Sequence, residues 1–189
     1  GEMAVLTREG VKVENGKGEA VKPDVQRITW DPIQAEKGGF KHFMLKEIYE
    51  QPEAIQQTIS QALDGHNLRD DFLSHANADF AKIQTVQIIA CGTSYHAGMI
   101  AKYWFEQLIG VPCQVEIASE FRYRTPVIVA NTLYICISQS GETADTLAAL
   151  RETQKRAKAQ SIDICSMTIC NVATSSMVRE PAHHLVTLA

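Results

Sequence analysis

The chain has 189 residues, of which 45% are hydrophobic and 21% are charged, a composition typical of a soluble globular protein with one main core. Its formal net charge is −4, which is unlike the basic surface that nucleic acid requires, so we expect no nucleic-acid partner. No apolar run reaches the roughly 18 residues of a membrane-spanning helix. We therefore expect no membrane partner, and we find no signal-peptide pattern at the N-terminus.

Five cysteines are present, and their number and spacing are informative. The count is odd, no two form a CxxC pair, and most lie within apolar runs (Cys91, Cys113, Cys136, Cys165 and Cys170). This pattern favours free thiols packed as small apolar groups over disulfides or a metal site. Free thiols persist in a reducing compartment, so we predict a cytoplasmic location.

The first 30 residues differ in character from the remainder. Two apolar runs, 3–7 and 11–13, flank a short turn, which predicts a β-hairpin. An isolated hairpin is at best marginally stable. We therefore predict that residues 1–29 are the tail of a preceding domain with a linker, and that residues 30–189 form the main domain.

The next segment has helical periodicity. Apolar residues recur at three- and four-residue spacing across residues 41–63, which predicts helix. Pro52 lies inside this run and is expected to end one helix at Gln51 and to begin a second, because proline is tolerated in a first turn. A third, short helix is predicted within residues 68–83.

From residue 85 onward, strand and helix patterns alternate. Strands are predicted at 86–90, 113–118, 133–137, 162–170 and 185–188, and helices at 93–109, at 143–158 and near Ser175. Strands separated by helices indicate right-handed crossovers and a parallel sheet covered on both faces. The expected fold class is therefore α/β, a three-layer α/β/α sandwich with a parallel sheet.

Two strand-to-helix turns stand out as candidate binding residues. The first comprises Cys91, Gly92, Thr93 and Ser94, and the second Ser138, Gln139, Ser140, Gly141, Glu142 and Thr143. Ligands of parallel sheets bind beyond the carboxyl ends of the strands. N-capping alone explains hydroxyls in one such turn, but two hydroxyl-rich turns in one sheet favour ligand binding. Since neither turn carries a cation, a sugar phosphate fits them well.

Nucleotide binding has little support. The chain has no GxxxxGK[ST] loop and no GxGxxG fingerprint. A Rossmann nucleotide binder is therefore the least favoured reading.

Other polar residues favour ordinary roles. Glu142 could act as a base, but a negative charge that favours a helix N-terminus is the preferred interpretation. Cys91 is interpreted as packing, and His96 as a polar face residue of its helix. His183 and His184 have no partner pattern for a metal and are interpreted as surface or strand-edge residues.

The run 116–124 places Glu120, Arg122 and Arg124 just after a strand, with two aromatic residues between them. Arginine and aromatic enrichment is typical of interfaces. The sequence leaves open a subunit interface, a wall of the site and plain surface.

At these residues the chain resembles a known family. The segments 90–95, 116–123 and 138–146 resemble the first sugar isomerase (SIS) domain of the glucosamine-6-phosphate synthases, or isomerising glutamine–fructose-6-phosphate aminotransferases. Residues 42–52 resemble the helix that opens the isomerase half, and residues 169–172 with Ser175 and Ser176 match a later strand and turn. The resemblance covers residues 30–189, and residues 1–14 resemble the last strands of the glutaminase domain.

The resemblance implies a reaction and a ligand. In that family, ammonia from glutamine replaces the C2 oxygen of fructose 6-phosphate, and isomerisation gives glucosamine 6-phosphate. The matching residues expected to hold the sugar phosphate are Ser94, Ser138, Gln139, Ser140 and Thr143, with Cys91, Gly92 and Thr93 as the adjoining floor. The resemblance further implies a homodimer, a hexose 6-phosphate as ligand, and no metal or organic cofactor.

The extent of the chain limits this expectation. It begins with Gly1 rather than an initiator Met and ends at Ala189, before the first SIS domain of the family is finished. The family's acid/base Glu and His, its imine-forming Lys and its glutaminase nucleophile lie in parts that we expect this chain to lack. We therefore assign no catalytic residue and expect phosphate binding without chemistry. The alternatives are a non-catalytic SIS regulatory module and a phosphosugar isomerase complete in one domain.

Overall fold

The structure is a computed structural model that describes residues 2–23 and 36–188. The chain divides into two compact units, Gly1–Ile48 and Tyr49–Ala189, which are described separately. The predicted domain boundary between residues 29 and 30 lies outside the described residues. Within the described ranges, no helix is both long and apolar enough to cross a bilayer.

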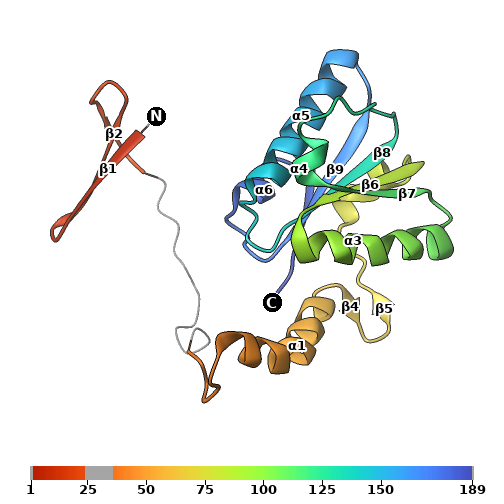
Figure 1. Cartoon of the computed structure of the whole chain (residues 1–189), viewed down its shortest axis with the longest axis horizontal. Helices are drawn as coiled ribbons and strands as arrows, with labels where there is room; N and C mark the ends of the chain where they lie inside the picture. The colour runs from red at the N-terminus through yellow and green to blue at the C-terminus, as the bar shows by residue number, and fades with distance from the viewer. Residues whose placement is uncertain (1, 24–35, 189) are drawn as a thin grey trace. The chain divides into compact units, whose positions relative to one another are not determined.

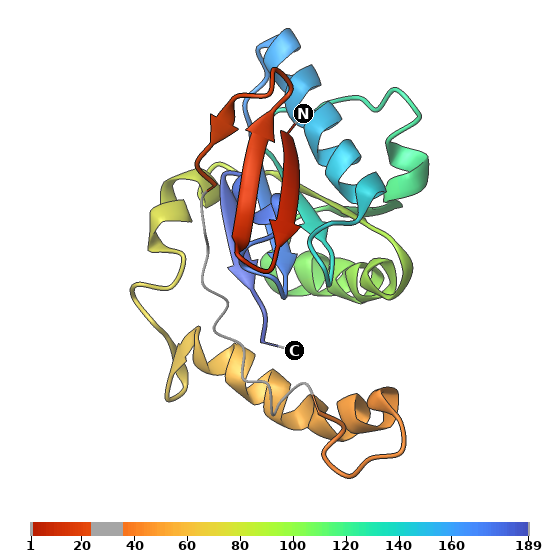
Figure 2. The same ribbon diagram turned by 90° about the vertical axis from the view of Figure 1, so that its left-hand side faces the viewer.

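The first unit contains a small antiparallel sheet (Figure 2). Strands β1 (Glu2–Thr7) and β2 (Gly10–Asn15) form the predicted hairpin. A third strand, β3 (Ala20–Val21), pairs with β2 and was not predicted. The Asn15 carboxamide oxygen accepts hydrogen bonds from the backbone N–H groups of Lys17 and Glu19, at 2.9 and 3.1 Å, and so turns the chain back onto β2.

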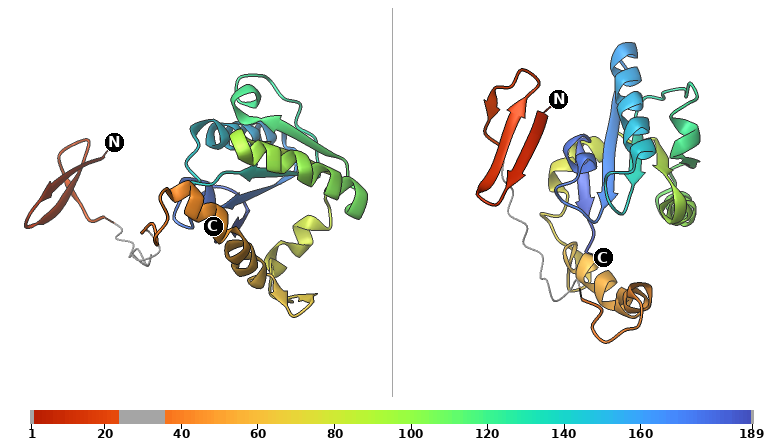
Figure 3. Two further views of the ribbon diagram at one scale, coloured as in Figure 1. Left: turned by 60° about the horizontal axis from the view of Figure 1, so that its bottom comes forward. Right: turned by 60° about the vertical axis from the view of Figure 1, so that its left-hand side comes forward.

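Helix α1 (Phe43–Ser60) continues through Pro52, so the prediction of two helices was wrong. Proline removes one backbone hydrogen bond and crowds the preceding turn, which destabilises a helix. In α1 the cooperative hydrogen bonding of the helical turns before and after Pro52 outweighs this loss. The hairpin of β4 (Leu63–Asp64) and β5 (Asn67–Leu68) follows α1 (Figure 3).

The helix predicted within 68–83 is much shorter than expected. A 3₁₀ turn, η1 (Ser74–Ala76), leads into the single-turn helix α2 (Asn77–Phe80). Leu73 has a φ of 51°, in the left-handed region that interrupts a right-handed helix. The helix therefore cannot extend back from η1 through Leu73.

The second unit contains the predicted parallel sheet. Its strands are β6 (Thr85–Ala90), β7 (Cys113–Ile117), β8 (Thr132–Ile137), β9 (Ile164–Cys170) and β10 (His183–Val186). They lie in the order β10-β9-β8-β6-β7, and every neighbouring pair is parallel. All five predicted strands are confirmed, although β10 begins two residues before its predicted start.

The main helices of this unit are α3 (Gly92–Trp104), α4 (Ala118–Phe121), α5 (Ala144–Gln160) and α6 (Ser176–Arg179), and a π-helical turn, η2 (Phe105–Ile109), extends α3. In Figure 1, α3 and α5 lie on opposite sides of the sheet. Successive strand residues point to opposite faces, so Ile88 packs in a cluster with Phe105, and Ile89 in a cluster with Leu150 of α5. The three-layer α/β/α prediction is confirmed.

Candidate functional site

The candidate site begins from the topology of the sheet. Strands β6 and β8 are neighbours, but the chain leaves β6 toward β7 on one side and leaves β8 toward β9 on the other. Ala90 and Ile137 are register partners at the carboxyl ends of these strands, so the turns that follow them begin side by side. The turn after β6 enters α3 on one face, and the turn after β8 enters α5 on the other. This switch point is where doubly wound sheets bind ligands.

The turn after β6 presents a helix start without a side-chain cap. Cys91, half-buried and extended, precedes α3, and no side chain at this position bonds the first backbone N–H groups of the helix. Gly92 has a φ of 56°, a conformation that favours glycine, and nothing lies within 4 Å of where a Cβ would be. Thr93 is exposed and Ser94 half-buried. The N-terminus of this 13-residue helix therefore offers donors and the positive end of its dipole.

The turn after β8 is ordered by its own hydroxyls. Ser138 is 3% exposed, and its Oγ accepts a hydrogen bond from the Gly141 backbone N–H at 3.1 Å. The same oxygen lies 2.8 Å from Oγ1 of Thr143, so the two hydroxyls share a hydrogen bond. Thr143 precedes α5 without capping it, and Gln139 and Ser140 are exposed. Both turns predicted from the sequence thus lead into helices whose N-termini lack a side-chain cap.

Both the backbone conformation and the packing at position 141 require glycine. Its φ is 67°, and a Cβ on this residue would lie 2.1 Å from Oγ of Ser175. The Gly141 carbonyl also accepts a hydrogen bond from the Met177 backbone N–H at 3.1 Å. The turn after β8 is therefore held directly against the segment that joins β9 to α6, a contact that residue spacing does not reveal.

The Glu142 side chain caps the first residue of α6. Its carboxylate accepts a hydrogen bond from the Ser176 backbone N–H at 2.6 Å. Hydrogen bonds from Ser176, followed by the charges of Arg179 and Arg151, lower the pKa of Glu142 below its ordinary value. The carboxylate is thus held ionised, as the preferred sequence interpretation expected, but the helix it favours is α6 rather than its own helix, α5.

The two turns contain no cationic residue, but the structure places the guanidinium of Arg122 at the start of α5. Arg122, just after α4, forms an ion pair with Asp145 in the first turn of α5, with 2.6 Å between Nη1 and Oδ1. The hydrogen bond that Arg122 donates to the Asp145 carboxylate raises the pKa of Arg122. Arg124 pairs instead with Glu116 and stacks over the Phe121 ring at 5.1 Å. The sequence could not separate the roles of these two arginines, because they lie on the same short run.

The cysteines are largely as predicted. Cys113, Cys136, Cys165 and Cys170 are buried, Cys91 is half-buried, and all five are free thiols. Burial raises the pKa of Cys113 to about 11 and that of Cys136 to about 12, so these thiols stay protonated and unreactive. Packing as small apolar groups is confirmed for the buried four.

His183 was predicted to be a surface or strand-edge residue; it does lie in the edge strand β10, but it is buried and not on the surface. It is 5% exposed, and its Nε2 lies 3.0 Å from Oδ2 of Asp79. His184, the next residue, is exposed, as expected of alternation along a strand. The partner of His183 lies 104 residues earlier, so no local pattern could have revealed the contact.

Comparisons with known proteins agree with the fold described above. The family model described as "SIS domain" matches residues 79–189. The chain is 72% identical over its whole length to a glutamine–fructose-6-phosphate aminotransferase (isomerizing) of Acinetobacter baylyi and 48% identical to one of Pseudomonas putida. It covers only 31% and 30% of those two proteins.

A solved structure is also similar. It is titled the C-terminal domain of glucosamine-fructose-6-phosphate aminotransferase from Francisella tularensis, with 51% identity and a TM-score of 0.71. The match covers 80% of this chain and 41% of that one. With a family model that matches more than half of its residues, this chain belongs to the SIS domain family.

Proposed function

We propose that this chain forms the phosphate-binding turns of a glutamine–fructose-6-phosphate aminotransferase, and that its ligand is a hexose 6-phosphate. The observation that carries the proposal is the meeting of two hydroxyl-rich turns at the switch point between β6 and β8. Both turns lead into helices of 13 and 17 residues with no side-chain cap. Backbone N–H groups and helix dipoles at such a position favour a phosphate without requiring lysine or arginine.

The proposed contacts are the residues that match the family's motifs, and their exposure and hydrogen bonds separate their roles. The phosphate is held by Ser94, Ser138, Gln139, Ser140 and Thr143, above a floor made by Cys91, Gly92 and Thr93. Ser138 acts mainly by ordering the turn, because its oxygen already accepts from Gly141. Exposed Ser140 and Thr93 are free to donate to a phosphate oxygen, and Ser140 keeps its acceptor role toward the Glu142 N–H at 3.2 Å.

The proposed reaction belongs to the whole protein. Ammonia from glutamine replaces the C2 oxygen of fructose 6-phosphate, and isomerisation yields glucosamine 6-phosphate. The names of the curated relatives contain glutamine, fructose 6-phosphate, amino transfer and isomerisation, which supports this proposal. The role proposed for this chain within that reaction is to fix the phosphate end of the sugar. Such fixing contributes to catalysis by orienting the reacting carbons, which lie at the opposite end of the hexose.

We further propose that the protein is a cytoplasmic homodimer. Large apolar side chains are exposed along α3 and η2: Ile100, Tyr103, Trp104, Leu108 and Ile109. An exposed apolar surface of this kind is typical of a protein–protein contact. Free cysteines throughout support a reducing compartment.

The proposal is tested by ligand titration of the purified chain. Isotope-labelled protein is titrated at millimolar concentration with fructose 6-phosphate, glucosamine 6-phosphate or unphosphorylated fructose, and backbone amide resonances are followed by NMR. We expect both phosphates to shift the amides of the two turns, and fructose to leave them unchanged. Absence of any shift in the turns with both phosphates would refute the proposal.

Matched variants sharpen this test. Thr93→Val and Ser140→Ala remove one exposed hydroxyl each and should each weaken phosphate binding by about 10- to 100-fold, since a hydrogen bond to a charged group contributes about 1.5–3 kcal/mol. Ser161→Ala removes an exposed serine at the opposite end of α5 and should leave the affinity unchanged. Equal losses in all three variants would contradict the assignment of the turns.

A further inference from the structure

A second cluster of reactive side chains lies outside the candidate phosphate site. Asp79 of α2, Cys165 of β9 and His183 of β10 each offer a ligand atom, and these atoms lie within 4.8 Å of one another. His183 is the first residue of β10 and Cys165 the second of β9. The cluster therefore lies toward the amino ends of the parallel strands, whereas the phosphate-binding turns follow their carboxyl ends.

Two of the three residues are buried, and Asp79 is half-buried. Cys165 and His183 are 6% and 5% exposed. Nε2 of His183 has a partner in Asp79, but its Nδ1 is buried with no hydrogen-bond partner. The observation that points to a ligand is the donor set itself: a buried thiol, a buried imidazole and a carboxylate whose ligand atoms lie within 4.8 Å of one another.

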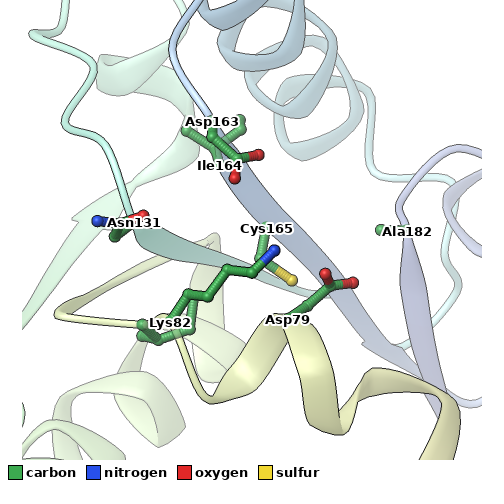
Figure 4. A pocket seen from close by; sticks show the side chains of 8 residues that line it. Asp79, Lys82, Asn131, Asp163, Ile164, Cys165 and Ala182 are labelled. Atoms are coloured by element: carbon green, nitrogen blue, oxygen red, sulfur yellow. The ribbon is translucent and has the colours of Figure 1, made fainter.

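A cavity gives access to this cluster. It has a volume of about 230 Å³ and is lined by Asp79 and Cys165, with Lys82 and Asp163 also on its wall. Figure 4 shows the Asp79 carboxylate and the Cys165 thiol on the same side of this cavity. Two carboxylates against one ammonium on the wall favour a cation inside it.

We propose that Asp79, Cys165 and His183 bind a divalent zinc ion, with a water molecule from the cavity as the fourth ligand. Sulfur, imidazole nitrogen and carboxylate oxygen are the donors that zinc takes, and three protein ligands with a water is a common zinc arrangement.

The Nε2–Oδ2 separation is close to that of tetrahedral coordination, and all three ligand atoms lie within 4.8 Å of one another. With bonds of about 2.0 Å to nitrogen and oxygen and about 2.3 Å to sulfur, a tetrahedral ion holds N and O about 3.3 Å apart and S and N about 3.6 Å apart. The observed separation of Nε2 and Oδ2 is 3.0 Å. Opening the hydrogen bond by a few tenths of an ångström is enough to admit the ion between these two atoms.

The proton balance is simple. Binding releases one proton, from the Cys165 thiol to solvent, while the His183 proton moves from Nε2 to Nδ1 and the ring stays neutral. Thiolate and carboxylate together then balance the two positive charges of the ion. Without metal, burial and the charges of Asp79 and Asp163 raise the pKa of Cys165 to about 11, so the thiol is protonated until a cation enters.

Zinc at this position would join three separate segments of the chain. Asp79 precedes the sheet in sequence, whereas Cys165 and His183 lie on its last two strands. An ion bound only by the folded chain stabilises it by mass action. The proposal does not depend on sugar-phosphate binding.

The test uses metal-free chain prepared with a chelator. Zn²⁺ is titrated against a chromophoric chelator, and Co²⁺ is added in a separate experiment to detect a thiolate-to-cobalt charge-transfer band. We expect one equivalent of tightly bound zinc, a charge-transfer band with cobalt, and a higher midpoint of thermal unfolding with zinc. Absence of the band together with no stoichiometric zinc binding would overturn the proposal.

Matched variants identify the ligands. Cys165→Ser and His183→Gln should each weaken zinc binding by more than about tenfold, or about 1.4 kcal/mol, and Cys165→Ser should abolish the cobalt band. Cys113→Ser and His184→Gln replace another buried thiol and the neighbouring exposed imidazole, and should keep both zinc binding and the band. Asp79→Asn, at a half-buried position, serves if His183→Gln does not fold. Equal losses in the test and control variants would refute the site.

Discussion

Gly141→Ala is the substitution whose effect the structure defines most sharply. The left-handed backbone at a φ of 67° costs an alanine about 1–2 kcal/mol. The new methyl carbon would lie 2.1 Å from Oγ and 2.4 Å from Cβ of Ser175, where carbon contacts are normally about 3.5–4.0 Å, so the turn must move by more than an ångström. Overpacking of this kind adds about 1–3 kcal/mol. We expect a total loss of about 2–5 kcal/mol in the free energy of unfolding.

Urea unfolding followed by circular dichroism measures this loss, and two variants separate its parts. Gly110→Ala places alanine at a φ of 76° with nothing within 4 Å, so it should lose only the backbone contribution of about 1–2 kcal/mol. Ser175→Gly removes the clashing side chain and should recover about 1 kcal/mol or more in the Gly141→Ala background, seen as coupling in a double-mutant cycle. If Gly141→Ala costs no more than Gly110→Ala, or if Ser175→Gly restores nothing, the reasoning is wrong.

Three further predictions follow from packing and charge. Gly98→Ala brings a methyl carbon 2.9 Å from Cγ2 of Ile88 and should lower the free energy of unfolding by about 1–3 kcal/mol in urea titrations. Ile88→Ala removes Cγ2, so the two substitutions should show favourable coupling in a double-mutant cycle. Glu142 has a lowered pKa in the folded state, so its stabilising effect is present above the ordinary glutamate pKa of about 4.3 and is lost as pH falls through the lower folded value. Unfolding of Glu142→Gln should therefore change less between about pH 6 and about pH 3 than that of the unsubstituted chain, and an equal change would contradict this. Iodoacetamide at neutral pH should alkylate half-buried Cys91 before Cys136, whose pKa is raised to about 12, and peptide mass spectrometry showing the reverse order would contradict the burial of Cys136.

Local patterns predicted the elements whose signals lie within a few residues. The apolar strand runs and the periodic helices after residue 85 placed the five parallel strands and both long helices of the second unit correctly. The prediction at Pro52 was wrong, because the loss of one backbone hydrogen bond was taken to end the helix. In the structure α1 is continuous through Pro52. At Leu73 the error was the reverse: a helix was predicted where the backbone interrupts one. Leucine has no preference for the left-handed conformation that it adopts here, so the sequence contains no signal for this interruption.

The residues of the two turns could be found from sequence, because glycine and hydroxyls between a strand and a helix are recognisable wherever they occur. The roles within the turns could not. Ser138 and Ser140 look equivalent in sequence, yet Ser138 is buried and orders the turn while Ser140 is exposed. Glu142 was expected to favour a helix start, but only the fold decided that this helix is α6.

Strand alternation, helical periodicity and turn chemistry are local properties of the chain, so they were enough to predict a three-layer α/β protein with two hydroxyl-rich turns. Only the tertiary structure decided that Gly141 lies against Ser175, that Arg122 pairs with Asp145, and that His183 meets Asp79 and Cys165. These contacts join residues 18 to 104 positions apart that have no common spacing. They exist because the parallel sheet brings distant segments together, the first two contacts at the carboxyl ends of the strands and the third toward their amino ends.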